Sequence, residues 1–118
     1  MLPSRMIDVP TCDDIERELR EYPAATFICY VWAPWCVPCR RIGPHLEEIV
    51  KVRAKDAVFL KVNADGCVDF LRKYTLKSIP VLLAVSRGRE LGRLYGELPK
   101  TEIVRFVEES IKAGTREP

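Results

Sequence analysis

Residues 32–39 read Trp-Ala-Pro-Trp-Cys-Val-Pro-Cys, with two thiols three positions apart. The octet follows an apolar, β-branched run over 26–32 and precedes a helical pattern, which places Cys36 at a strand-to-helix junction. The unpaired N–H groups and the positive dipole end of a helix favour an anion there, so we expect the pKa of Cys36 to lie below the free value of about 8.5. Cys39 falls one turn later, close enough to close a disulfide. The octet therefore predicts a reversible dithiol/disulfide switch.

Other interpretations of the two cysteines fit the sequence less well. A structural zinc site normally has a second Cys-x-x-Cys or a histidine pair, whereas this chain has no second pair and His45 is its only histidine. Haem attachment would need a histidine directly after the second cysteine, and Arg40 stands there. Two inert packing cysteines are the remaining alternative, but the rigid, aromatic approach through Pro34 and Trp35 favours a surface site.

Length and composition favour a soluble globular protein. The chain has 118 residues, 47% of them hydrophobic and 31% charged, which suits one domain over 1–118. A net charge of +2 is too balanced to predict a nucleic acid or an anionic membrane as partner. No stretch approaches the roughly 18 apolar residues of a membrane span.

Cysteine usage predicts a reducing compartment. The chain has five cysteines, an odd number, and residues 1–10 show no apolar core of a secretory signal. We expect a cytoplasmic protein, with an organelle as the alternative if a transit peptide has been removed.

Hydrophobic spacing and turn residues predict eight elements in the order αβαβαββα. Because the early strands alternate with helices they should pair in parallel, whereas the last two strands form an antiparallel hairpin. This order predicts an α/β fold, with a mixed central sheet flanked by helices on both faces. The expected elements are a helix from Thr11 that ends at Pro23, a strand over 26–32, a helix that starts near Cys36 and has an apolar stripe through Val50, a strand over 57–62, a short helix around 68–74, strands over 81–85 and about 90–95, and a helix that ends near Gly114.

The octet resembles the active site of thioredoxins, whose usual form is Trp-Cys-Gly-Pro-Cys. The resemblance keeps the family's order and spacing over about 10–113, which leaves short extensions at both ends, and it implies the thioredoxin fold. Its further matches are Pro44 inside the active-site helix, 61–65 as the third strand of the family and its exit, 78–80 as the segment of the cis-proline, Gly88 in the hairpin turn and Gly96 before the last helix.

The resemblance implies roles for the site residues. Cys36, the more exposed thiol, would attack a disulfide of a partner protein, and Cys39 would resolve the mixed disulfide. Pro80 would be cis, although X-Pro bonds are usually trans. Asp65 would accept the indole N–H of Trp35, for which a core position is the alternative. The expected substrate-binding residues are Trp35, Val37, Pro38, Ile79, Pro80 and Gly96, the last with an ordinary turn glycine as its alternative.

Two positions depart from the family. Tyr30 stands where thioredoxins place a buried aspartate that assists proton transfer at the deeper thiol, while Lys61 matches the nearby lysine. A phenol with a pKa of about 10 is no anionic base at neutral pH, though it can donate a hydrogen bond or relay a proton. We therefore expect a slower resolving step, with Lys61 as either a supporting group or a plain strand-end lysine. Val37 replaces the usual glycine between the cysteines, and the sequence does not predict how that shifts the reduction potential.

The other thiols carry weaker expectations. Cys29 should be a small core residue, Cys12 exposed near a helix start, and Cys67 a surface or half-buried thiol. The alternative for Cys67 comes from the resemblance, because some animal thioredoxins carry a regulatory cysteine there. Trp32 should lie in the core, and His45 should be solvated.

The leading interpretation is a monomeric protein disulfide reductase that needs no bound cofactor. The resemblance implies disulfide-containing proteins as substrates and a thioredoxin reductase-like electron donor. One alternative is a thioredoxin-fold interaction or assembly module in which redox activity is secondary. Another is an oxidase or isomerase of an oxidising compartment.

Overall fold

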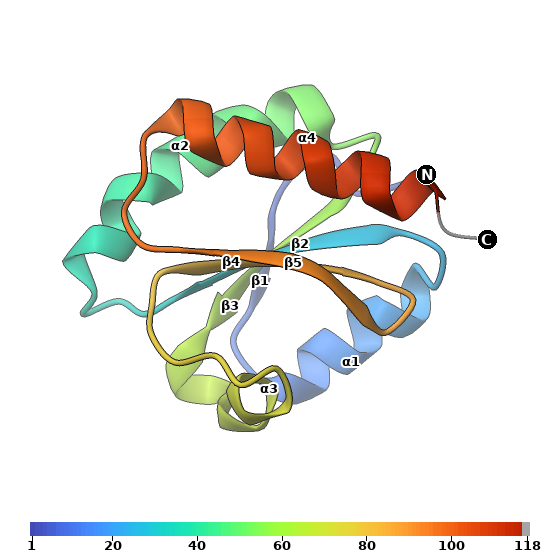
Figure 1. Cartoon of the computed structure of the whole chain (residues 1–118). Helices are drawn as coiled ribbons and strands as arrows, with labels where there is room; N and C mark the ends of the chain where they lie inside the picture. Colours follow the sequence, from blue (N-terminus) through green and yellow to red (C-terminus); the bar gives the residue numbers. More distant parts are fainter. Residues whose placement is uncertain (117–118) are drawn as a thin grey trace.

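The computed structural model describes residues 1–116, which form one mixed sheet with helices on both faces (Figure 1). The five strands lie in the order β1-β3-β2-β4-β5. The elements are β1 (Ile7–Val9), α1 (Cys12–Glu21), β2 (Thr26–Trp32), α2 (Val37–Arg53), β3 (Val58–Asn63), the 3-10 turn η1 (Ala64–Gly66), α3 (Val68–Lys73), β4 (Val81–Ser86), β5 (Arg89–Tyr95) and α4 (Lys100–Arg116).

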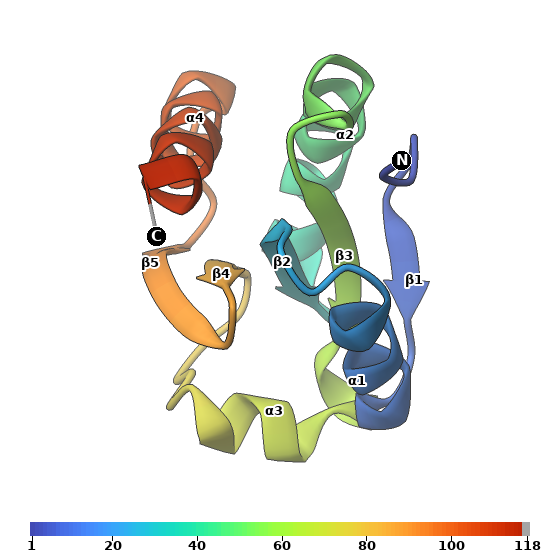
Figure 2. The same cartoon turned by 90° about the vertical axis from the view of Figure 1, so that its right-hand side faces the viewer.

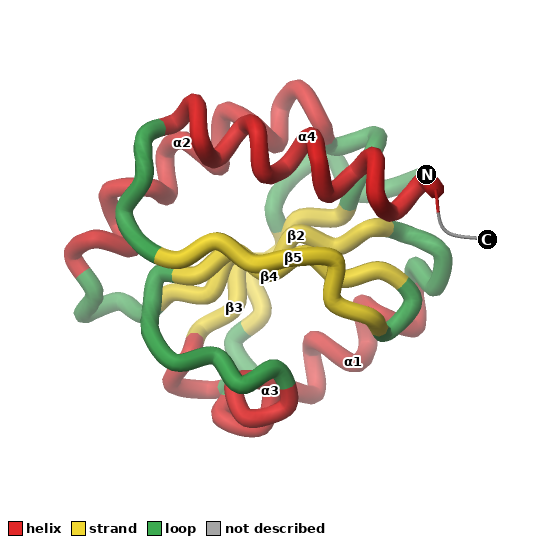
Figure 3. Tube along the Cα trace, viewed as in Figure 1, coloured by secondary structure: helices red, strands yellow, loops and turns green. Residues whose placement is uncertain are grey.

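Strand β2 lies at the centre of the sheet. It pairs in parallel with β3 and antiparallel with β4, as the alternation of elements predicts. Helices α2 and α4 cover one face and α1 and α3 the other (Figures 1 and 3). All residues of β2 except Trp32 are buried, because both faces of the strand pack against a helical layer. This explains why its sequence is a continuous apolar run. The expected thioredoxin fold is confirmed.

The sequence-based order lacks one strand and ends one helix too early. The first element is the edge strand β1, which pairs in parallel with β3 through Ile7 and Leu60. Three residues are too short to show periodicity, so only the long-range pairing reveals this strand. Helix α4 continues past Gly114 to Arg116. A Cβ at Gly114 would lie 1.9 Å from Oγ1 of Thr26, so this glycine allows α4 to pack against β2 and does not end the helix.

The hairpin turn between β4 and β5 matches its prediction. Arg87 and Gly88 have φ of 52° and 80°, the left-handed region that a two-residue hairpin turn requires. Within residues 1–116, none of the helices has the length and apolar character needed to cross a membrane.

Strand directions bring three separate segments to one edge of the sheet. The ends of β2 and β3 lie together, since Trp32 pairs with Asn63. The start of β4 lies beside them, since Val31 pairs with Val81. The residues that follow β2 and β3 therefore meet those that precede β4.

Candidate active site

Cys36 and Cys39 form a disulfide at the start of α2, with their Cα atoms 5.3 Å apart. Cys36 is the N-cap of the helix, and its sulfur accepts a hydrogen bond from the backbone N–H of Cys39 at 3.2 Å. Cys36 retains 5% of its surface exposure and Cys39 none. The helix therefore offers a backbone donor and its positive dipole end to the more accessible sulfur, which stabilises a thiolate there when the disulfide opens.

Trp35 stands on the surface beside the dithiol. Its side chain is 67% exposed, and the indole N–H donates to both carboxylate oxygens of Asp65, at 3.1 and 3.3 Å. Asp65 lies in η1, and its own backbone N–H donates to Oδ1 of Asn63 at 2.9 Å. The core alternative for Trp35 is wrong, because the ring lies over the rim of the site with its polar edge held by the turn after β3.

The loop before β4 faces the dithiol from the other side. The Ile79–Pro80 peptide bond is cis. Ile79 packs against the small buried cluster of Ala33, Cys36 and Cys39. The N–H of Gly96 donates to the carbonyl oxygen of Pro80 at 2.9 Å, and its φ of 98° favours glycine. The turn after β5 is thereby fixed against the loop that borders the disulfide.

The expected substrate-binding residues differ in exposure. Trp35, Val37, Pro38 and Gly96 are exposed, Ile79 is half-buried, and the ring of Pro80 is buried. Pro80 can therefore act on a substrate only through the backbone it shapes. Of the other five residues, Ile79 packs against the cluster that contains Cys36.

Trp32 packs against the core cluster that includes Ile28 and Tyr30, as predicted, and it also borders the site. The side chain is half-buried and packs against the cluster of Ala33, Cys36 and Cys39. Nζ of Lys61 lies 4.2 Å from the centre of its ring, within cation–π range. The spacing in the sequence indicates this position of Trp32. Tyr30 and Trp32 are two residues apart on a strand, so their side chains share one face of the sheet.

Tyr30 is buried next to Cys39. It is 1% exposed, and its hydroxyl donates a hydrogen bond to the backbone carbonyl of Cys39. Burial raises the pKa of the phenol to about 12. Tyr30 is therefore a neutral hydrogen-bond donor at physiological pH and cannot act as an anionic base.

Tyr30, Trp32 and Lys61 line a surface groove between α2 and the sheet. The carboxylates that border this groove are Glu47 and Glu48 on α2. Tyr30 connects this groove to the dithiol helix, because its hydroxyl donates to the backbone carbonyl of Cys39.

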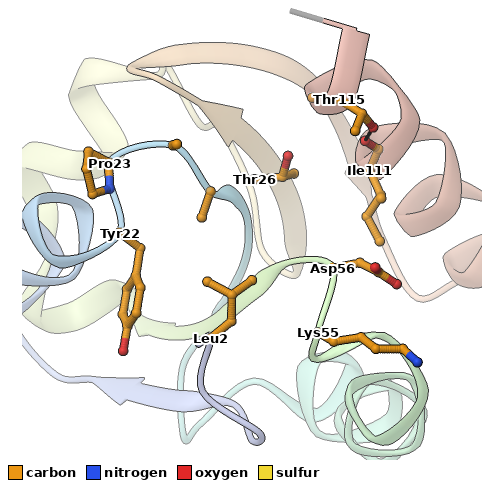
Figure 4. A pocket seen from close by; sticks show the side chains of 11 residues that line it. Leu2, Tyr22, Pro23, Thr26, Lys55, Asp56, Ile111 and Thr115 are labelled. Carbon is orange, nitrogen blue, oxygen red and sulfur yellow. Dashed lines mark hydrogen bonds between the residues drawn. The ribbon is translucent and has the colours of Figure 1, made fainter.

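A separate apolar pocket lies at the other end of β2. Its wall includes Leu2, Tyr22, Thr26 and Ile111 (Figure 4). Thr26 begins β2, whereas the dithiol follows Trp32 at the end of the strand. The pocket is therefore not part of the redox site.

The remaining cysteines are more buried than expected. Cys29 lies in the core as predicted, and burial raises the pKa of its thiol to about 12. Cys67 has no exposed surface, so the expected surface or half-buried thiol is wrong. It lies where η1 passes into α3 and packs under the sheet. Cys12 and His45 are half-buried. Residues 1–116 contain no group of three or more histidine, cysteine or acidic side chains that could hold a metal.

Comparison with known proteins leads to the same family that the octet resembles. The sequence model of the thioredoxin family matches residues 9–109. The chain belongs to the thioredoxin family. It is 34% identical over 80 residues to thioredoxin C-2 of Corynebacterium nephridii, which covers 68% of this chain and 74% of the relative. Thioredoxin of Haemophilus influenzae is 35% identical over 80 residues, or 68% of this chain and 75% of its own length.

Solved thioredoxin structures superpose on most of the chain. Schistosoma mansoni thioredoxin gives a TM-score of 0.77 at 28% identity, covering 92% of this chain and 94% of that one. Fasciola hepatica thioredoxin gives 0.79 at 26% identity, over 89% and 99%. As a thioredoxin-family protein with a bonded Cys36–Cys39 pair, the chain is a thiol–disulfide oxidoreductase. No feature of these comparisons favours an interaction or assembly module.

Proposed function

We propose that this oxidoreductase works mainly as a protein disulfide reductase, with Cys36 as nucleophile and Cys39 as resolving thiol. The observation that carries the proposal is the position of Cys36, which caps α2 and accepts a hydrogen bond from the backbone N–H of Cys39. An anionic sulfur is the attacking species in disulfide exchange. The less accessible Cys39 sits one turn away, where it can reach the sulfur of Cys36 but not a bulky partner.

The exchange has two steps. The Cys36 thiolate attacks one sulfur of the partner disulfide, which forms a mixed disulfide and releases the other partner sulfur as a thiolate. Cys39 then loses its proton and attacks the Cys36 sulfur, which closes the Cys36–Cys39 disulfide and releases the second partner thiol. Two electrons pass to the partner, and two protons complete its thiols.

The surface around Cys36 supports a protein substrate. Trp35 and Val37 are large apolar side chains with 67% and 44% of their surfaces exposed. Ile79 packs against the cluster that contains Cys36, and Gly96 is tied to Pro80 of the same loop by its backbone hydrogen bond. We propose that an extended segment of the partner lies across this surface, against the backbone that the cis bond of Pro80 presents.

Tyr30 and Lys61 set the proton chemistry of the second step. Tyr30 holds the carbonyl of Cys39 and stays neutral, so it steadies the helix turn without accepting the thiol proton. Lys61 lies over the Trp32 ring and lines the same surface groove as Tyr30. We propose that these residues support catalysis less effectively than an aspartate would, and that resolution is the step affected.

Trapping the mixed disulfide tests the assignment of the two thiols. Reduced Cys39→Ser protein, mixed with an oxidised disulfide peptide, should accumulate a covalent adduct on Cys36. The matched Cys36→Ser variant should form little adduct, and both variants should lose insulin reduction. Equal adduct formation on Cys36→Ser would show that the roles are reversed or that neither thiol is activated.

We propose a thioredoxin reductase-like enzyme as electron donor, which NADPH consumption with a bacterial thioredoxin reductase would test. We propose that residues 1–118 act as one monomeric unit whose redox group is the Cys36–Cys39 pair itself, without a bound cofactor. Light scattering of the purified protein tests the monomer, and its absorbance spectrum tests for a bound cofactor.

Three unpaired cysteines support a reducing compartment. We propose the cytoplasm, which cell fractionation would test.

A further inference from the structure

Arg93, on the edge strand β5, joins that strand to the end of α3. Its guanidinium group makes five hydrogen bonds, as many as it has N–H donors. Nη2 donates to the carbonyl oxygen of Tyr74 at 2.6 Å, and Nη1 donates to that of Thr75 at 3.2 Å. Tyr74 is the C-cap of α3. Arg93 therefore holds the chain that leaves α3 against the edge of the sheet.

Glu90 fixes the orientation of the guanidinium group. Its two carboxylate oxygens accept hydrogen bonds from Nε and Nη2 of Arg93, both at 2.7 Å. Residues three apart on a regular strand point to opposite faces of the sheet. Here the pairing of β4 with β5 shifts by one residue between Ala84 and Val85, so Glu90 and Arg93 share a face. The irregularity in β5 thus allows a bidentate ion pair, which fixes the guanidinium plane.

The segment that Arg93 holds, residues 74–80, runs from α3 to the cis-proline loop at the start of β4 (Figure 2). Thr75 has φ of 53°, in the left-handed region that a β-branched residue rarely adopts, so its backbone needs support from outside the segment. The hydroxyl of Tyr95 accepts from Nη1 of Arg93 at 3.0 Å and from the backbone N–H of Lys77 at 3.5 Å. Arg93 therefore supports the start of the segment directly and its middle through Tyr95.

The far end of the same segment borders the disulfide. Ile79 packs against the cluster that contains Cys36, and the carbonyl oxygen of Pro80 accepts from the N–H of Gly96 at 2.9 Å. Residues 74–80 are therefore bonded to β5 and the turn after it at both ends and in the middle. Loosening the start of the segment would let the cis-proline loop move relative to the sulfur of Cys36.

We propose that Arg93 is a positioning residue that holds the cis-proline loop ready for an extended segment of a partner protein. The proposal rests on the proposed function, in which the backbone at Pro80 borders a protein substrate. A loop that is already ordered binds its partner at a lower entropic cost, so Arg93 acts on the affinity for protein disulfides. The thiolate of Cys36 is stabilised by the start of α2, so its reactivity should not depend on Arg93.

Kinetics with a protein disulfide and a small disulfide test the proposal. In Arg93→Gln, KM for insulin should rise about 3- to 10-fold while kcat stays within about 2-fold of the wild type. Hydroxyethyl disulfide is too small to lie along the loop, so kcat/KM for this substrate should keep the wild-type value. The pH dependence of Cys36 alkylation by iodoacetamide should also be unchanged.

Two further variants show what the five hydrogen bonds contribute beyond a surface charge. Arg93→Lys keeps a positive charge beside Glu90, but one ammonium group cannot reach both backbone carbonyls and Tyr95 together. KM for insulin should therefore stay raised in Arg93→Lys. Arg17→Gln is the matched control, because Arg17 forms an ion pair of the same three-residue spacing with Asp14 on α1, at 3.0 Å. This control should keep the wild-type KM.

Hydrogen exchange followed by NMR measures the position of the segment without enzyme turnover. The backbone N–H of Lys77 should exchange about 2- to 10-fold faster in Arg93→Gln, as expected for the loss of hydrogen-bond support. The amides of β2 should stay protected over the same period in both proteins, which shows that the fold is intact.

The results separate this inference from the proposed function. The role of Arg93 is overturned if the wild type reduces insulin and Arg93→Gln has the same KM, if Arg93→Lys restores the wild-type KM, or if Lys77 exchanges at the wild-type rate. It is also overturned if hydroxyethyl disulfide reduction falls as much as insulin reduction. A wild-type protein that reduces hydroxyethyl disulfide but not insulin would contradict the proposed function and this inference together.

Discussion

Replacing Tyr30 by aspartate should accelerate resolution of the mixed disulfide at neutral pH. The buried phenol, with a pKa raised to about 12, donates to the carbonyl of Cys39 and cannot take the proton of the Cys39 thiol. A carboxylate at this position can take it, and general base assistance contributes about 10²–10⁴-fold when well placed. A newly introduced carboxylate is not optimised, so we expect about a 10-fold gain, at the cost of some stability.

The two variants Tyr30→Asp and Tyr30→Phe separate the chemical effect from the packing effect. Tyr30 is 1% exposed, so losing its ring should lower the free energy of unfolding by about 3–5 kcal/mol. Domains of this kind have a free energy of unfolding of about 5–15 kcal/mol. A protein that begins above the lower limit of this range should therefore stay folded after the substitution. Tyr30→Phe keeps the ring and removes one hydrogen bond, which should cost about 1 kcal/mol.

A single-turnover experiment measures the step directly. Reduced protein is mixed with a disulfide peptide, quenched in acid at intervals, and the mixed disulfide is quantified by mass spectrometry. Its decay should be fastest in Tyr30→Asp and similar in the wild type and Tyr30→Phe, and insulin turnover should follow the same order. A folded Tyr30→Asp protein that resolves no faster than the wild type would refute the reasoning. A much slower Tyr30→Phe would show that the phenol itself transfers the proton.

Three further predictions test the rim, the packing and the buried thiols. Trp35→Phe removes the indole donor to Asp65, a hydrogen bond worth about 0.5–1.5 kcal/mol, so kcat/KM for insulin should fall about 2- to 10-fold. Asp65→Ala should lower kcat/KM by a similar factor. If the losses of the two single variants add in the double variant, the effect does not come from this hydrogen bond. Gly114→Ala should lower the free energy of unfolding by about 1–3 kcal/mol in urea titrations, because its Cβ would meet Oγ1 of Thr26 at 1.9 Å, and Thr26→Ala should restore most of the loss. Burial raises the pKa of Cys29 from 9.0 to about 12, so the unfolded chain releases this proton first. The stability of the reduced protein should then fall as pH rises from about 9 towards about 12, and Cys29→Ala should show a shallower fall between pH 8 and pH 10.

The features predicted correctly from sequence depend on neighbours along the chain. Cys36 caps α2 and Cys39 lies one turn later because a three-residue spacing at a helix start leaves little other choice. The apolar run of β2 predicts its burial on both faces, and the residue types at 87–88 suit a tight turn. Local geometry and hydrophobic spacing contain this information, so the order of residues alone is enough to predict the redox pair and the class of fold.

The features that were missed depend on contacts between distant segments. Strand β1 exists because Ile7 pairs with Leu60, and Gly114 continues a helix because Thr26 lies against it. The hydroxyl of Tyr30 finds the carbonyl of Cys39 only once β2 and α2 have packed together. Cys67, for which the sequence suggested a surface or half-buried thiol, is fully buried because the start of α3 packs against the core under the sheet. Spacing along the chain determines which groups can react, whereas burial and long-range packing decide which partners they meet.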